Sequence, residues 1–141
     1  EAEALVGLLP EFPALRATVT FSCRDEAHVS QGEPFADCVA LAAARPQVVA
    51  VGLNCTAPHL AEALLRAAAA VTDKPLVVYP NSAEAWDAAA RCWRGAADET
   101  PWGDRARTWR AAGARLVGGC CRVGPEVIRV IRAALLPDGP R

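Results

Sequence analysis

The sequence predicts an α/β domain made of parallel β/α units. Four short runs rich in valine, leucine and threonine alternate with segments of helical periodicity along the 141 residues. The run at residues 48–53 is apolar almost throughout, as is typical of a strand buried on both faces of a parallel sheet. Because successive parallel strands connect by right-handed crossovers, the alternation favours one parallel sheet with helices packed on it.

The N-terminal half of the chain supplies the first two units. A helix is predicted at residues 2–9 by an apolar stripe made of Ala2, Leu5, Val6, Leu8 and Leu9. Residues 17–23 are β-branched and aromatic and predict a strand, and a helix is expected from residue 35 to residue 44. After the strand at 48–53, Pro58 begins an alanine-rich helix that is expected to run to about residue 71.

The C-terminal half predicts two further strands, at residues 75–79 and 114–118. Between them, residues 83–102 are less regular, and a helix is expected at 103–112, ending at Gly113. The last helix is expected to begin at Pro125, with an apolar face formed by Val127, Ile128, Ile131 and Leu135. We expect one structural unit over residues 1–136 and a disordered tail at 137–141.

Composition and charge narrow the possible functions. The chain is 52% hydrophobic and 22% charged with a net charge of −1, which gives no support for a nucleic-acid or membrane partner. It has no apolar run of about 18 residues, no signal-peptide pattern and no glycine-rich phosphate-binding motif. We therefore expect a cytoplasmic protein without a nucleotide cofactor. The chain contains no methionine, so we also expect a piece of a longer protein.

Three cysteines stand where predicted strands end. Cys55 follows the strand at 48–53, and Cys120 and Cys121 follow the strand at 114–118. Because the carboxyl ends of parallel strands meet at one edge of a sheet, three thiols can converge there. Three thiolates around one point are typical of a zinc site with an open fourth position, which predicts bound Zn²⁺. The alternative is that these cysteines pack as small hydrophobic residues, which is typical of a single cysteine.

Two glycines, Gly118 and Gly119, precede the paired cysteines. In a regular strand, neighbouring side chains point to opposite faces, so Cys120 and Cys121 would not both reach one ion. Since glycine adopts backbone angles closed to other residues, we predict a kink that turns both thiols toward one target. A redox role for a Cys120–Cys121 disulfide is a weaker alternative, because it leaves Cys55 unexplained.

Other polar residues fall at the same strand ends. Asn54 is predicted either to bind a substrate or to shape the turn, and the same two roles are open for Tyr79 and Asn81. Arg122 either stabilises the anionic centre or a substrate carboxylate, or lies at the surface. Cys23 is expected to line the pocket. Packing roles are expected for Cys38, Cys92 and the four tryptophans, the tryptophans on outer helices.

A known family shares these strand-end motifs. The sequence resembles zinc-dependent homocysteine S-methyltransferases in Val51-Gly52-Leu53-Asn54-Cys55-Thr56, Tyr79-Pro80-Asn81-Ser82 and Gly118-Gly119-Cys120-Cys121-Arg122, and also at residues 20–25 and 113–114. The resemblance implies the C-terminal half, strands five to eight, of a (β/α)8 TIM barrel. It also implies that Cys55, Cys120 and Cys121 hold Zn²⁺. The implied reaction transfers a methyl group from S-methylmethionine or S-adenosylmethionine to homocysteine, giving methionine.

The sequence departs from the family pattern after Arg122. The family commonly has Thr-Thr-Pro there, whereas this chain has Val123-Gly124-Pro125, which removes hydroxyls able to cap a helix or contact a substrate. Family residues that hold the homocysteine amino and carboxylate groups lie largely in the N-terminal half. The alternative prediction is therefore a truncated, catalytically incomplete zinc-binding half-barrel. It would assemble with the missing N-terminal half or with itself, since unclosed strands leave two open edges.

Overall fold

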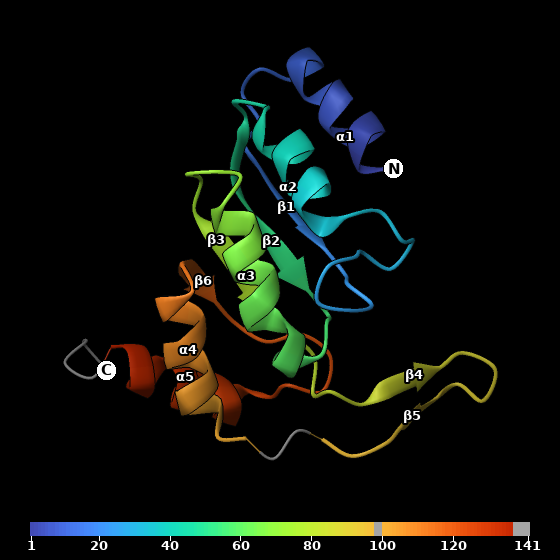
Figure 1. Ribbon diagram of the computed structural model, residues 1–141, viewed down its shortest axis with the longest axis vertical. Helices are drawn as coiled ribbons and strands as arrows, with labels where there is room; N and C mark the ends of the chain where they lie inside the picture. Colours follow the sequence, from blue (N-terminus) through green and yellow to red (C-terminus); the bar gives the residue numbers. More distant parts are fainter. Residues whose placement is uncertain (98–99, 137–141) are drawn as a thin grey trace.

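The structure is a computed structural model that describes residues 1–97 and 100–136. Its centre is a four-stranded sheet in the order β1-β2-β3-β6 (Figure 1). The strands are β1 (Ala17–Phe21), β2 (Val48–Asn54), β3 (Leu76–Tyr79) and β6 (Ala114–Val117). All three neighbouring pairs are parallel, which confirms the predicted α/β class and the four predicted strands. The predicted tail at 137–141 lies outside the described residues.

Helices alternate with these strands as predicted. They are α1 (Ala2–Leu8), α2 (Phe35–Ala43), α3 (Ala61–Ala69), α4 (Trp102–Ala111) and α5 (Pro125–Leu135), with 3₁₀ turns η1 (Leu9–Glu11) and η2 (Pro58–Leu60). Pro58 therefore begins a 3₁₀ turn ahead of the α-helix. In α1, Val6 is buried but Leu5 and Leu8 are exposed, so much of the predicted apolar stripe faces outward.

The hydrophobic core lies between the helices and one face of the sheet. Because side chains alternate along a strand, Val51, Leu53 and Val78 point to this face, where they are fully buried. Helix α3 packs on β2 and β3, and α4 packs on β6 and α5. Phe35 of α2 and Trp109 of α4 fill the same core. Burial of each such side chain contributes about 2 kcal/mol, which fixes the strands that precede the three cysteines.

The opposite face of the sheet carries a mixture of polar, small and apolar side chains. The strand register pairs Thr20 with Gly52 and Gly52 with Val77, so these residues share a face. Leu116, which pairs with Val77, is 48% exposed there. Its neighbour Val77 on the same face is only 7% exposed, so the exposure is greatest at the edge strand β6.

A two-stranded hairpin, β4 (Ala85–Asp87) and β5 (Cys92–Arg94), projects from the body of the molecule (Figure 1). Trp86 and Trp93 face each other across it with ring centroids 5.4 Å apart. The prediction that all four tryptophans pack on outer helices is wrong for these two, because each ring packs on the other strand of the hairpin. It is correct for Trp102 and Trp109, which pair on α4 at 6.0 Å.

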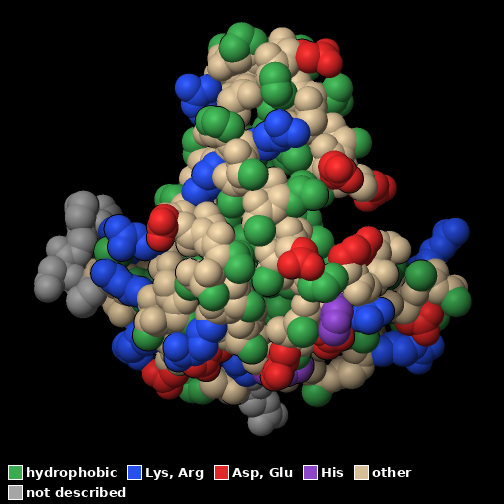
Figure 2. All heavy atoms as spheres, turned by 45° about the horizontal axis from the view of Figure 1, so that its top comes forward, with side chains coloured by type: hydrophobic (Ala, Val, Ile, Leu, Met, Phe, Trp, Pro, Cys, Tyr) green, Lys and Arg blue, Asp and Glu red, His purple; other side chains and the backbone are tan. Residues whose placement is uncertain are grey.

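The surface shows no extended patch of one charge on the face drawn in Figure 2, where acidic and basic side chains are interspersed. Among residues 1–97 and 100–136, no helix is long and apolar enough to cross a bilayer.

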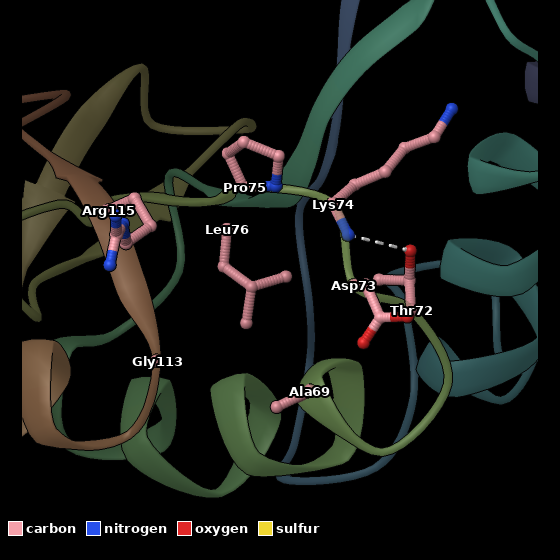
Figure 3. Close-up of a pocket in the computed structure, with 8 residues that line it drawn as sticks. All are labelled: Ala69, Thr72, Asp73, Lys74, Pro75, Leu76, Gly113 and Arg115. Carbon is pink, nitrogen blue, oxygen red and sulfur yellow. Dashed lines mark hydrogen bonds between the residues drawn. The ribbon is translucent and has the colours of Figure 1, made fainter.

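A pocket of about 390 Å³ lies at the amino ends of β3 and β6, between the α3–β3 connection and Gly113 (Figure 3). The Lys74 side chain leaves this pocket, and its ammonium donates to the carbonyls of Arg45 and Val48 at 2.5 Å each. The pocket is therefore at the opposite edge of the sheet from the cysteines.

Candidate metal centre

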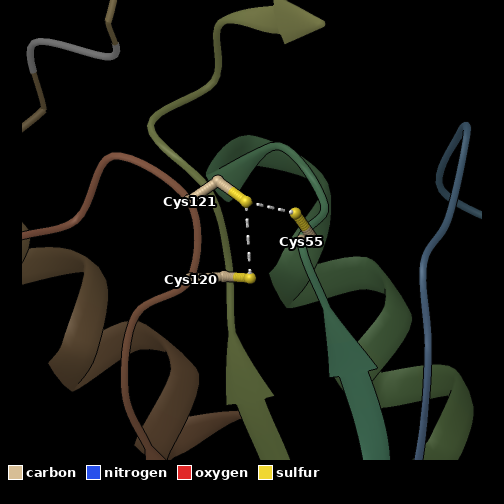
Figure 4. Close-up of side chains that lie close together, drawn as sticks. All are labelled: Cys55, Cys120 and Cys121. Carbon is tan, nitrogen blue, oxygen red and sulfur yellow. Dashed lines mark hydrogen bonds between the residues drawn. The ribbon is translucent and has the colours of Figure 1, made fainter.

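Three thiols converge at the carboxyl edge of the sheet. Cys55 follows β2, and Cys120 and Cys121 lie in the loop after β6; β3 lies between those two strands. The Sγ atoms of Cys55 and Cys121 are 3.3 Å apart, and those of Cys120 and Cys121 are 3.9 Å apart. All three Sγ atoms lie within 4.8 Å of one another, and Figure 4 shows the side chains facing a common point.

These distances suit a single metal ion. With Zn–S bonds of about 2.3 Å and tetrahedral angles, sulfur ligands lie about 3.8 Å apart. The separations of 3.3 and 3.9 Å fall on either side of that value. Sulfur ligands favour zinc and other thiophilic metals over magnesium or calcium. Three cysteines would leave the fourth tetrahedral position for a substrate.

Cys55 sits in a left-handed turn, with φ of 45°. This conformation is strained for a residue with a side chain and costs on the order of 1 kcal/mol or more. Hydrogen bonds on both sides hold it: the Cys55 N–H donates to the Tyr79 carbonyl at 3.0 Å, and the Asn81 amide donates to the Cys55 carbonyl at 3.2 Å. The turn directs the thiol away from the path of β2 and toward the other two sulfurs.

Thr56 anchors the same turn from inside the protein. It is 1% exposed, and its hydroxyl accepts the Cys23 N–H and donates to the Asn54 carbonyl, both at 2.9 Å. Its own carbonyl accepts the Asn81 N–H at 3.1 Å. Sequence reasoning missed this positioning role, although a threonine directly after a cysteine at a strand end was a visible signal.

The loop after β6 continues the sheet ladder before it turns. The Gly118 N–H donates to the Val78 carbonyl at 2.9 Å, and the Cys120 N–H donates to the Pro80 carbonyl at 2.8 Å. A Cβ on Gly119 would lie 2.2 Å from Cγ1 of Val123. Because the chain turns at these residues, the side chains of Cys120 and Cys121 point in the same direction.

The predicted reason for this turn is wrong in one respect. Neither Gly118 nor Gly119 has a positive φ; the left-handed residue is Arg122, with φ of 62°. Gly119 is needed for space beside Val123, while the unusual backbone angle falls just after the cysteines.

Arg122 forms an ion pair with Glu84, from its Nε to the Glu84 Oε2. The Ser82 hydroxyl donates to the same oxygen at 2.7 Å. The Glu84 side chain is only 11% exposed. The bond from Ser82 and the bond from Arg122 lower the pKa of the Glu84 carboxyl, so it is ionised at neutral pH. Ser82 belongs to a motif quoted from the sequence, but sequence reasoning missed its role and missed Glu84 altogether.

The predicted substrate residues lie around the thiols with different partners. Asn54 and Tyr79 are paired in register at the ends of β2 and β3. The Tyr79 hydroxyl is 2.7 Å from the Thr20 hydroxyl on β1, so its ring crosses over β2. Asn81 holds Cys55 through its amide nitrogen and accepts the Ala83 N–H at 2.9 Å. The Asn54 side chain forms no hydrogen bond with another described residue.

Burial raises the pKa of the Cys55 thiol well above its ordinary value, and contacts with Cys121 and Cys120 add to the effect. A thiol in this setting is protonated at neutral pH, so a metal ion would displace a proton on binding. Burial likewise raises the pKa of Cys23 to about 12. Cys23 lies outside the three-sulfur group but contributes its backbone N–H to Thr56.

Comparison with known proteins identifies the family. The family model described as Homocysteine S-methyltransferase matches residues 1–135. The chain belongs to the homocysteine S-methyltransferase family. This confirms the resemblance seen in the strand-end motifs.

Relatives in the homocysteine S-methyltransferase family are similar to this chain over nearly all of its length. Homocysteine S-methyltransferase YbgG of Bacillus subtilis is 45% identical over 133 residues, which cover 94% of this chain and 42% of the relative. Homocysteine S-methyltransferase of Escherichia coli is 46% identical over 134 residues, covering 94% and 43%. The chain therefore spans less than half the length of these relatives.

A solved homocysteine S-methyltransferase has a similar fold. The crystal structure of the homocysteine methyltransferase MmuM from Escherichia coli, in a metallated form, superposes with a TM-score of 0.76 and 42% identity. The match covers 94% of this chain and 40% of that chain. In this chain, Cys55, Cys120 and Cys121 form the one group of three or more potential metal ligands within residues 1–97 and 100–136.

Proposed function

We propose that this chain carries the metal centre of a zinc-dependent homocysteine S-methyltransferase. The reaction would move a methyl group from a sulfonium donor, S-methylmethionine or S-adenosylmethionine, to the thiol of homocysteine, giving methionine. The observation that carries the proposal is the convergence of the Cys55, Cys120 and Cys121 sulfurs at the carboxyl edge of a parallel sheet. Membership in the family supports the choice of acceptor.

We further infer that residues 1–136 form the C-terminal half of a (β/α)8 barrel, with β1, β2, β3 and β6 as its last four strands. The parallel order of these strands and the partly exposed face at Leu116 support this arrangement. So does coverage of 42% and 43% of two relatives. A reducing, cytoplasmic location suits a centre that depends on three reduced thiols.

Each cysteine in this proposal is a metal ligand supplied by a rigid strand end. Bound zinc would keep the sulfur of homocysteine deprotonated and nucleophilic at neutral pH. The remaining task of the protein is to orient two substrates, because the transfer forms one sulfur–carbon bond in line with the bond that breaks. The sulfonium donor leaves as a neutral thioether.

Asn54, Tyr79 and Asn81 are the proposed substrate contacts. The Asn54 amide has no hydrogen-bond partner among the described residues and shares a strand-end position with Tyr79, next to Cys55. The Tyr79 hydroxyl shares one hydrogen bond with Thr20 and retains further capacity. The Asn81 amide, which holds the Cys55 carbonyl through one N–H, has a second N–H left for a substrate.

A methyl-transfer assay tests this function. The zinc-loaded chain would be incubated with homocysteine and either S-methylmethionine or S-adenosylmethionine, and methionine formation would be measured. Activity in the wild type and its loss in Cys121→Ser support the proposal, with Cys38→Ser as the matched control that retains activity. Equal activity in Cys121→Ser and wild type would contradict it.

The open sheet face favours a second candidate: a zinc-binding half-barrel that is inactive until another half joins it. Leu116 is 48% exposed on that face, and β1 and β6 are edge strands. Edge strands and uncovered apolar faces promote association. An inactive chain that binds zinc and sediments as a dimer supports this candidate. A stable monomer whose behaviour is unchanged by Leu116→Lys argues against it.

A further inference from the structure

Both cysteine-bearing loops rest on one short segment, residues 80–84, which we define as the β3–β4 connection. Because β3 lies between β2 and β6, the connection leaves the sheet between the two loops. The Pro80 carbonyl accepts the Cys120 N–H at 2.8 Å, and Asn81 donates to the Cys55 carbonyl at 3.2 Å. The distance between the two thiol loops is thus set through a third segment that contributes no sulfur.

Strained backbone is concentrated at this junction. Cys55, Ala83 and Arg122 are three of the four non-glycine residues with positive φ among the described residues. Each such residue costs on the order of 1 kcal/mol or more, and persists where neighbouring contacts determine its conformation. Hydrogen bonds to the ends of β3 hold Cys55, whereas Arg122 is held by its side-chain ion pair with Glu84.

The Glu84 carboxylate is well suited to fix the Arg122 position. Its side chain is 11% exposed, whereas the Arg122 side chain is 50% exposed, so the carboxylate is the buried partner. Ser82, which is 6% exposed, donates to the same carboxylate oxygen at 2.7 Å and limits its rotation. Arg122 directly follows Cys121, so a fixed guanidinium also fixes the end of the Cys120–Cys121 turn.

We propose that the Glu84–Arg122 ion pair holds the Cys120–Cys121 loop in its metal-binding conformation. Glu84 is therefore a positioning residue for the metal centre, 38 residues away from Arg122 in the chain. Without it, the loop keeps its strained angle at Arg122 with fewer contacts to support it, and the two thiols spend less time facing Cys55. This inference rests on the proposed zinc site.

Zinc affinity of the reduced chain, measured by competition with a chromophoric chelator, tests the pair. Glu84→Gln keeps the size of the side chain but removes its charge, and we expect zinc affinity to fall about 10- to 100-fold. Arg122→Gly also removes the pair, and we expect a fall of similar size even though glycine relieves the left-handed backbone. The double variant should be little weaker than either single variant, because both changes remove one interaction.

Glu62→Gln is the matched control. It breaks another Glu–Arg pair, with Arg66 on α3 at 2.8 Å, and should leave zinc affinity unchanged. Circular dichroism of the metal-free variants checks that each is folded. Zinc affinity within twofold of wild type in Glu84→Gln, full additivity in the double variant, or an equal loss in Glu62→Gln would overturn the inference. A wild-type chain that binds no zinc would overturn the proposed function together with it.

Discussion

Strands β2 and β3 approach each other closely at Gly52, shortly before Cys55 in the chain. A Cβ at this position would lie 1.9 Å from the backbone carbonyl oxygen of Val77, so any side chain must push β2 and β3 apart. Gly52→Ala should therefore lower the free energy of unfolding by about 2 kcal/mol or more, measured by urea denaturation. Gly7→Ala is the matched control, because nothing lies within 4 Å of a Cβ there. In helix α1 it should raise stability slightly, and equal effects of both substitutions would contradict this account.

The buried thiol of Cys23 makes the stability of the protein depend on pH. Burial raises its pKa from 9.0 to about 12, so between these values the unfolded chain loses the thiol proton while the folded chain keeps it. The unfolded state then binds fewer protons, and stability falls as pH rises above about 9. From pH 8 to pH 10, wild type should lose about 1 kcal/mol more than Cys23→Ala in urea denaturation. Parallel losses in the two proteins would show that Cys23 does not titrate this way.

Single residues were predictable from sequence where their chemistry was local. Cys55, Cys120 and Cys121 could be placed together because each follows a strand of a parallel sheet. The backbone angles that aim them could not, since Arg122 is held by Glu84, which is 38 residues away. A side-chain pair at that separation leaves no pattern in one sequence.

Helices and strands were predictable because local composition indicates them: β-branched and apolar runs for the strands, and helical periodicity or proline and glycine boundaries for the helices. The four strands of the central sheet and the five helices appear close to their predicted positions. The β4–β5 hairpin was missed, because its three-residue strands are too short to show alternation. The contact between Trp86 and Trp93 stabilises the hairpin, and this contact can be seen only in the structure.

The start of α5 shows what the departure from the family pattern does to a helix. Gly124 is the N-cap, with an extended backbone and without a side-chain cap. Gly124→Ser should raise the free energy of unfolding by roughly a few tenths of a kcal/mol, measured by thermal denaturation. The serine hydroxyl can accept a hydrogen bond from a backbone N–H of the first helical turn that otherwise has no partner. The substitution requires the flexible Glu126 side chain to turn away. Gly124→Ala, which adds a Cβ but no hydroxyl, should lower the free energy of unfolding in the same thermal denaturation experiment. A gain in stability as large as that of Gly124→Ser would contradict the capping argument.

At the scale of the whole molecule, the two faces of the central sheet are covered differently. Helices cover the face that carries Val51, Leu53 and Val78, while Leu116 on the opposite face is 48% exposed. The sequence predicted this parallel sheet, and the family match agrees with it over residues 1–135.

The metal content of the freshly prepared, reduced chain tests the central claim most directly. Elemental analysis should find one zinc ion per chain, and Cys55→Ser, Cys120→Ser and Cys121→Ser should each lose it. Cys38→Ser and Cys92→Ser make the same chemical change outside the three-sulfur group and should keep it. A zinc-free wild type under reducing conditions, or zinc retained in all three ligand variants, would contradict the account.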